Sequence, residues 1–112
     1  MRIGPEGSGT GRRVLRRYEL APAARRDLLE IARYYRANGG KHVAHRTVSR
    51  ILDKCRLIAE TPGTIGQRRK EIHRELRSFP VLPYVVYFRF SGEMVEILRI
   101  LHGRRDVRPD LF

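Results

Sequence analysis

The 112-residue chain is short of several residue types, and each shortage excludes a class of protein. Its single cysteine, Cys55, cannot form a disulfide within the chain, so a reducing compartment suits it. No apolar run approaches the roughly 18–20 residues that a membrane-spanning helix needs. The first residues also lack the apolar segment of a secretory signal peptide. We therefore expect a cytoplasmic protein without a membrane anchor.

Lysine and acidic residues are also scarce, and arginine dominates the charge. Lys and Arg number 24 against 12 Asp and Glu, which gives a formal net charge of +12. Only Lys41, Lys54 and Lys70 are lysines. Guanidinium groups suit phosphates and carboxylates, so the composition favours nucleic acid or an acidic protein as a partner. A basic surface without any partner is the alternative, and charge alone does not separate the two.

The N-terminal segment has almost no apolar side chains. Residues 1–13, MRIGPEGSGTGRR, contain four glycines and one proline. Such a segment buries too little surface to offset the entropy lost on ordering, so we expect a disordered tail. One domain then covers residues 14–112.

A short strand and two amphipathic helices follow the tail. The stretch LRRYEL places Tyr18 and Leu20 on one side, which indicates an edge strand. Pro22 suits the first turn of a helix, and Asn38-Gly39-Gly40 suits its end. A second helix is predicted from about Lys41 to Glu60, and helices joined so closely form an antiparallel hairpin. The apolar stripes contain Ala24, Leu28, Ile31 and Tyr35 in the first helix and Ala44, Val48, Ile51, Cys55 and Ile58 in the second.

The last third of the chain is typical of strands. EIHRELRSF, residues 71–79, predicts a strand with Ile72 and Leu76 on one face and His73, Glu75 and Arg77 on the other. YVVYFRF, residues 84–90, predicts a central strand buried on both faces. The Ser91-Gly92 turn returns the chain antiparallel through EMVEILRILH. The order β-α-α-β-β-β predicts an α+β fold, a helical hairpin packed on a mostly antiparallel sheet.

Few residue patterns point to catalysis. His42 and His45 lie three apart without a third ligand, so we expect no metal site and no cofactor. A metal-independent ribonuclease needs an acid, a base and cations around the phosphate. The set His73, Glu75 and Arg77 together with His102 and Arg104 supplies those residue types. The alternative is that these side chains only satisfy backbone groups and solvent at strand ends.

The stretch RILHGRRD, residues 99–106, closes the predicted sheet. We expect Arg99 and Leu101 to continue the strand, and His102, Gly103 and Arg104 to turn the chain. The interpretation that we favour is a structural strand end that presents a basic contact surface.

Several stretches together resemble the ParE branch of the ParE/RelE toxin superfamily. They are YELAPAARRDLLEIARYY, LDKCRLIAETPG, RELRSFPVLPYVVYFRF and EILRILHGRRDV, within about residues 17–108. The most specific parts are the LRSF…YVVYF pair and RILHGRRD. The resemblance implies the toxin of a type II toxin–antitoxin module, with the helical hairpin and sheet predicted above.

The resemblance also implies partners and site residues. ParE-like members poison DNA gyrase, whereas RelE-like members cleave mRNA in the ribosomal A site. Arg77, His102 and Arg104 occupy regions comparable with the catalytic residues of RelE-like enzymes, but the lysine-rich helix of those enzymes is missing. That departure favours the ParE branch, with Arg77, Arg104 and Arg105 as candidate target contacts. The implied partner is an antitoxin with an acidic C-terminal segment.

A third hypothesis is a basic adaptor that binds nucleic acid. The chain has neither the interleaved aromatics of single-strand binders nor a helix-turn-helix signature.

Overall fold

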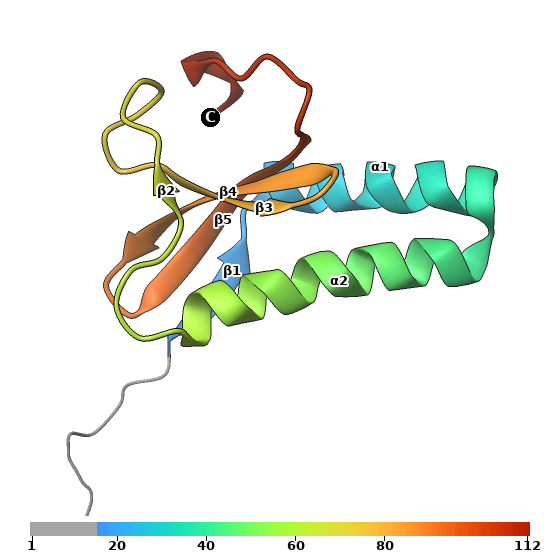
Figure 1. The fold of residues 1–112 in the computed structure, drawn as a ribbon, viewed down its shortest axis with the longest axis horizontal. Coiled ribbons are helices and arrows are strands. Elements are labelled where there is room, and N and C mark those ends of the chain that lie inside the picture. The colour runs from blue at the N-terminus through green and yellow to red at the C-terminus, as the bar shows by residue number, and fades with distance from the viewer. Residues whose placement is uncertain (1–15) are drawn as a thin grey trace, which may run out of the picture.

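The computed structural model describes residues 16–112, as two helices packed on one face of a five-stranded sheet (Figure 1). The predicted α+β fold is confirmed. The predicted tail, residues 1–13, lies outside the described residues. The elements are β1 (Arg17–Leu20), α1 (Pro22–Gly39), α2 (Lys41–Glu60), β2 (Gln67–Arg68), β3 (Arg77–Val81), β4 (Tyr84–Ser91), β5 (Met94–His102) and a short 3-10 helix, η1 (Pro109–Leu111).

The sheet has the strand order β1-β5-β4-β3-β2. β1 pairs in parallel with β5, and all other neighbours pair antiparallel. The predicted edge strand is therefore confirmed, and its partner is the last strand of the chain. β4 is the middle strand, as YVVYFRF predicts, and the side chains of Val86 and Phe88 are fully buried.

Apolar side chains bury both faces of β4. On the helix side, Val86 and Phe88 pack in the main core with α1, α2 and β5. On the other side, Tyr87 packs with Leu76 and Leu101 in a smaller cluster that the C-terminal residues Val107 and Leu111 cover. A strand covered on both faces explains why its sequence is almost continuously apolar.

The predicted strand over residues 71–79 is wrong in its first half. β3 begins at Arg77, and a series of turns precedes it, closed by the Arg69 N–H donating to the Leu76 carbonyl at 2.8 Å. Ile72 and Leu76, four residues apart, would fit one face of a strand, but turns hold this segment: the N–H groups of Ile72 and His73 donate to the Arg69 carbonyl at 3.1 and 3.0 Å. His73 and Glu75 therefore do not share a strand face with Arg77. The additional strand β2 has only two residues, too few to leave an apolar pattern.

The helical hairpin has the predicted bounds. α1 ends before Gly40, whose φ of +90° lies in the left-handed region that favours glycine. Cys55 lies in the main core as predicted, and burial raises the pKa of its thiol to about 12. None of the helices within residues 16–112 is both long and apolar enough to cross a membrane.

Candidate functional site

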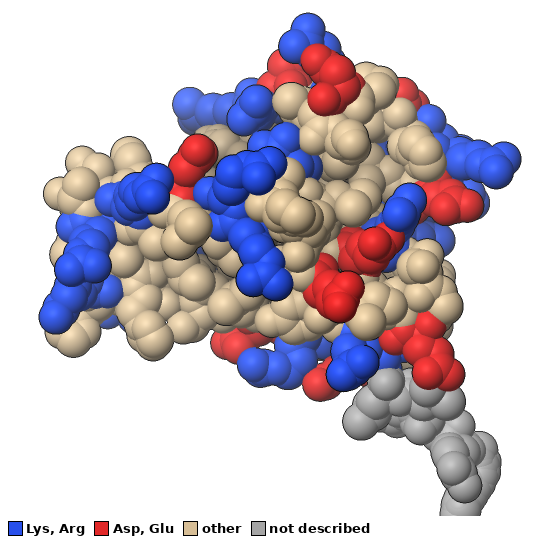
Figure 2. Space-filling model, turned by 180° about the vertical axis from the view of Figure 1, so that it is seen from behind, with Lys and Arg blue, Asp and Glu red and all other residues tan. Residues whose placement is uncertain are grey.

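Exposed charge does not by itself mark a site on this molecule. Lys and Arg are spread over much of the face that Figure 2 shows, with Asp and Glu between many of them. A site is marked instead by charged or hydrogen-bonding side chains that converge. Two places stand out, a cavity at the C-terminal end of β5 and a groove beside the start of α1.

His102 ends β5 and is held in a tight turn. Its Nδ1 accepts a hydrogen bond from the Arg104 N–H at 3.1 Å, and its carbonyl accepts one from the Arg105 N–H at 3.0 Å. The ring also packs edge-on against Tyr84, with 5.6 Å between the ring centroids. The turn predicted for residues 102–104 is therefore present. Because Nδ1 is an acceptor, the neutral ring carries its proton on Nε2 and can only donate there.

Gly103 fits this turn because of space. Its N–H donates to the Pro83 carbonyl at 2.8 Å, and a Cβ added at Gly103 would stand 3.2 Å from that oxygen. Its φ lies outside the left-handed region, so close approach and not backbone freedom explains the glycine.

A cavity of about 220 Å³ adjoins His102. It brings Arg105 and Tyr84 together with Glu30 and Tyr34 of α1. Burial raises the pKa of the Tyr84 phenol, and the neighbouring Tyr35 raises it further, so Tyr84 stays neutral and cannot act as a base. The sequence indicates only part of this set: residues 27, 30, 31 and 34 have the spacing that places them on one face of α1.

Asp27 also lines this cavity, and its carboxylate makes structural contacts. Its two carboxylate oxygens accept from the Arg99 guanidinium at 2.8 and 2.9 Å, and one of them also accepts from the Ile100 N–H at 2.9 Å. β1 ends at Leu20, so the β5 backbone beyond it has no strand partner on this side. The Asp27 carboxylate satisfies that free N–H and raises the pKa of Arg99 through the hydrogen bond.

Arg77 lies far from the His102 turn. It is opposite Phe88 on β4, whereas His102 is opposite Tyr84, four residues or about 13 Å away along the strand. The Arg77 guanidinium donates to the Gly66 carbonyl at 3.2 Å and stands over the Phe90 ring. The structure thus brings His102, Arg104 and Arg105 together but leaves Arg77 at the opposite end of the sheet.

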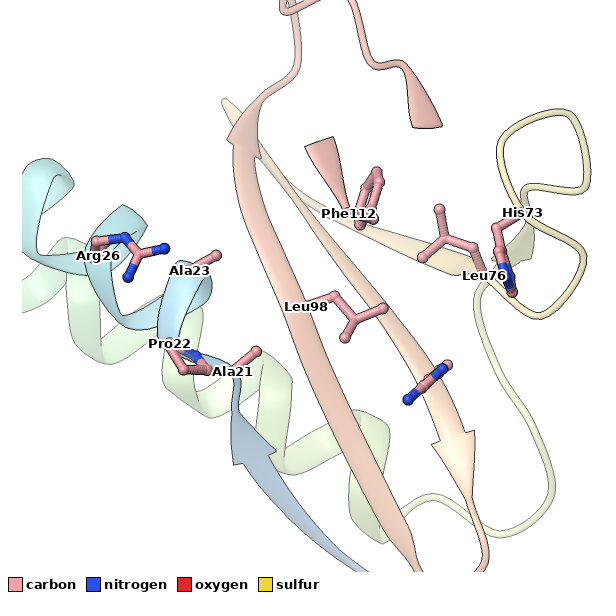
Figure 3. A pocket seen from close by; sticks show the side chains of 9 residues that line it. Ala21, Pro22, Ala23, Arg26, His73, Leu76, Leu98 and Phe112 are labelled. Carbon is pink, nitrogen blue, oxygen red and sulfur yellow. The ribbon is translucent and has the colours of Figure 1, made fainter. Parts of the chain in front are cut away.

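The second place is a groove of about 430 Å³ between the start of α1 and the C-terminus (Figure 3). Leu76, Leu98 and Phe112 give it apolar walls, and Arg26 and His73 stand at its sides. Arg89 also lines it but is paired with Glu96. His73 therefore belongs to this groove and not to the turn that holds His102. Such a groove suits a peptide with apolar side chains and a carboxylate.

Metal ligands do not gather in the part of the chain that the structure describes. No three side chains among His, Cys, Asp and Glu come together within residues 16–112. His45, from the pair of histidines near the start of α2, lies 3.5 Å from the Ser49 hydroxyl.

Comparison with known proteins assigns the fold and its sequence pattern to one family. The family model described as "ParE toxin of type II toxin-antitoxin system, parDE" matches residues 18–107. The chain belongs to the ParE toxin family. It is therefore a ParE-like toxin of a type II toxin–antitoxin system, and such a system implies an antitoxin as its partner.

Individual relatives of this ParE-family toxin carry two different names. Toxin ParE3 of Caulobacter vibrioides is 35% identical over 85 residues, which cover 76% of this chain and 84% of that protein. Toxin RelE3 of the same organism is 35% identical over 86 residues, covering 76% of this chain and 91% of that protein. A solved structure described as a chromosomal ParDE TA system from P. aeruginosa shares the fold, with a TM-score of 0.68. That match covers 79% of this chain and 96% of the other, at 22% identity.

Proposed function

We propose that this ParE-family toxin inhibits DNA gyrase by binding to it, acts in the cytoplasm and is neutralised by its own antitoxin. The observation that supports binding over catalysis best is the separation of the candidate catalytic residues. Arg77 stands about 13 Å along the sheet from His102. Acid–base cleavage of RNA needs those groups around one phosphate.

The bonding of His102 supports the same proposal. A general base needs a free ring nitrogen that can accept a proton, and Nδ1 is already used by the Arg104 N–H. In this proposal His102 holds the turn, while the exposed Arg104 and Arg105 contact the target. Their guanidinium groups can bind carboxylates or phosphates on the target. Arg77 would add a contact from the other end of the sheet.

The second candidate function is a RelE-like mRNA interferase. The cavity beside His102 favours it, because Glu30 and Arg105 lie in that cavity with two tyrosines. A carboxylate, a histidine and an arginine are the groups that metal-independent RNA cleavage uses. The relative named Toxin RelE3 keeps this alternative open.

The antitoxin proposal concerns the groove of Figure 3. An acidic segment of the antitoxin would place apolar side chains against Leu98 and Phe112 and a carboxylate beside Arg26. The net charge of +12 supports an acidic partner, because opposite charges lower the energy of the encounter complex.

Three variants separate gyrase inhibition from RNA cleavage. With gyrase as the target, His102→Gln keeps most of the toxicity, because glutamine still offers a hydrogen-bond acceptor to the turn. Arg104→Glu and Arg105→Glu weaken toxicity sharply, because a lost charge-assisted contact costs about 1.5–3 kcal/mol and repulsion adds to it. Arg74→Glu, an exposed arginine in the loop before β3, is the matched control and should keep its toxicity.

The measurements are growth arrest at matched soluble expression, gyrase supercoiling and ribosome-dependent mRNA cleavage. An interferase reverses the order of the variants, because loss of a general acid or base typically costs about 10²–10⁴-fold in rate. Codon-positioned mRNA cuts that disappear with His102→Gln, together with unchanged supercoiling, would contradict gyrase as the target.

A further inference from the structure

The two helices of the hairpin flank a hollow at the end of the hairpin that projects beyond the sheet (Figure 1). Its volume is about 520 Å³, and its walls come from residues 29–36 of α1 and 41–45 of α2. We call it the hairpin hollow. It shares no lining residue with the groove of Figure 3 or with the cavity beside His102. A ligand of the hairpin hollow would therefore leave both of those places open.

The floor of the hairpin hollow is apolar. Leu29 and Ala32 stand on one face of α1, because residues three apart on a helix are neighbours. Ala32 is half-buried, and Ala44 of α2, which also lines the hollow, is buried. These two alanines add little bulk, which leaves space between the helices. Leu29 is 57% exposed although its side chain is apolar, so part of this floor is uncovered.

Three exposed cations line the hollow beside this apolar floor. They are Arg33 and Arg36 of α1 and Lys41 of α2. None of them belongs to an ion pair between two described residues. His42 and His45 also line the hollow, and none of its described lining residues is Asp or Glu. The chemistry therefore suits a ligand that combines apolar side chains with negative charge.

The backbone of the hairpin indicates the conformation of that ligand. The N–H and C=O groups inside α1 and α2 bond to one another, so the hollow offers a peptide no strand edge. A peptide bound there must satisfy its own backbone groups, and a helix does so. The side-chain ridges of two packed helices also leave a groove that accepts a third helix. Leu29 and Arg36 are seven residues apart, or about 10 Å along α1, which corresponds to about two turns of the docked helix.

Two other occupants fit this hollow less well. A second copy of this chain would add positive charge, because basic residues outnumber acidic ones in both helices. A nucleic acid would leave Leu29 uncovered, because phosphates contact only the cations and base stacking needs aromatic rings. None of the described lining residues is Phe, Tyr or Trp.

We propose that the hairpin hollow docks an acidic amphipathic helix of another protein, as a third helix beside α1 and α2. Leucine-sized side chains of this helix cover Leu29 and fill the space above Ala32. Its carboxylates accept hydrogen bonds from Arg33, Arg36 and Lys41. The site is separate from the contacts proposed for gyrase and from the groove of Figure 3, so it does not depend on the proposed function.

The test uses the full-length toxin and a labelled helical peptide of about 18 residues, or five turns. The peptide has leucine at every third or fourth position and glutamate beside the leucines. Fluorescence anisotropy measures its Kd. A peptide of the same composition with its leucines dispersed around the helix should bind at least about tenfold more weakly, because it cannot present one apolar face. Poly-glutamate of the same length should also bind at least about tenfold more weakly, because it has no apolar side chains.

A pair of leucine variants tests the apolar contact. Leu29→Ala should raise the Kd of the amphipathic peptide about tenfold, because it removes the exposed apolar side chain of the hollow. Leu57→Ala is the matched control. Leu57 is also an exposed leucine of the hairpin, at 44%, but it lies outside the hollow, so its removal should leave the Kd unchanged.

A pair of arginine variants tests the charged contacts. Arg33→Gln/Arg36→Gln should raise the Kd of the amphipathic peptide about three- to tenfold, because two exposed ion pairs are lost. Arg26→Gln/Arg74→Gln removes the same charge from exposed positions, one in the groove of Figure 3 and one next to His73 of that groove. This control should change the Kd by less than about twofold, because it alters only the long-range attraction.

Several results would overturn the proposal. They are no binding of the amphipathic peptide, equally tight binding of either control peptide, and an equal change of Kd in both members of either pair of variants. A toxin dimer that Leu29→Ala dissociates would assign the hollow to a second copy. A DNA duplex that binds more tightly than the peptide, and loses its binding in Arg33→Gln/Arg36→Gln, would assign it to nucleic acid. Thermal unfolding of each variant checks its fold. The assay contains no gyrase and no antitoxin, so its failure and the failure of the proposed function are separate results.

Discussion

At the scale of single residues, the ion pair between Asp27 and Arg99 links α1 to β5 and to the C-terminus. The side chains are only 9% and 16% exposed, and the carboxylate also holds the Ile100 N–H. Arg99 in turn donates to the Leu111 carbonyl at 2.9 Å, which places the C-terminal segment over the outer face of the sheet. One carboxylate therefore organises the floor of the cavity beside His102.

Loss of this carboxylate charge should destabilise the fold strongly. Asp27→Asn leaves the largely buried Arg99 without a counter-charge, and breaking a buried pair typically costs about 3–5 kcal/mol. The measurement is urea unfolding: the midpoints of the variants are compared when the dependence of the unfolding free energy on urea concentration is the same. The control is Asp53→Asn, which breaks the exposed pair with Arg56 and should cost less than about 1 kcal/mol. Equal midpoints for the two variants would show that the buried pair contributes no more than a surface pair.

The sequence does not reveal this pair, because its partners are 72 residues apart. Asp27 lies next to Leu28 on an amphipathic helix, where a charged residue normally faces solvent. The turn at His102 could be predicted because its hydrogen bonds join neighbouring residues. The cavity could not, because Glu30 and Tyr34 reach it from another element.

At the scale of elements, local patterns predicted the helices and the central strand well. The bounds of α2 follow from an unbroken apolar stripe between Gly40 and Pro62, and β4 follows from β-branched and aromatic residues. The strand predicted before β3 is wrong because Ile72 and Leu76 have a spacing that fits one face of a strand, whereas turns hold them in the structure. β2 is stabilised by its pairing with β3 and has no signal of its own.

The central position of β4 makes a direct test of the architecture. Val86→Asp should abolish folding, because an unpaired buried carboxylate costs several kcal/mol, which is comparable with the whole stability of a small domain. Ser91→Asp, at the exposed end of the same strand, is the control and should remain folded. Circular dichroism and thermal unfolding measure both. A soluble Val86→Asp protein with a cooperative transition would contradict a strand buried on both faces.

At the scale of the whole molecule, the excess of arginine sets how partners approach. The chain has a net charge of +12, and Lys and Arg are spread over much of the face that Figure 2 shows. Long-range attraction depends on this total charge and little on the exact placement of each arginine. Composition alone therefore predicts that the partner is negatively charged. The groove that would hold this partner can be located only in the folded structure.

Association with the antitoxin should depend strongly on salt. Stopped-flow measurements of the association rate should show a steep fall as ionic strength rises, because screening shortens the range of attraction to about 10 Å at 0.1 M salt. The dissociation rate should change less, because apolar contacts in the groove hold the complex. An association rate that does not change with salt would contradict steering by charge.

The parallel pairing of β1 with β5 also has a consequence for the timing of synthesis. β1, α1 and α2 leave the ribosome first, but Asp27 meets Arg99 only after 72 further residues. At about 5–20 residues per second, that interval lasts about 4–14 s. A nascent chain that stops before β5 lacks both the partner strand and the counter-charge. Truncated translation products of this toxin should therefore be unfolded and harmless, and the cell meets an active toxin only when nearly the whole message has been read.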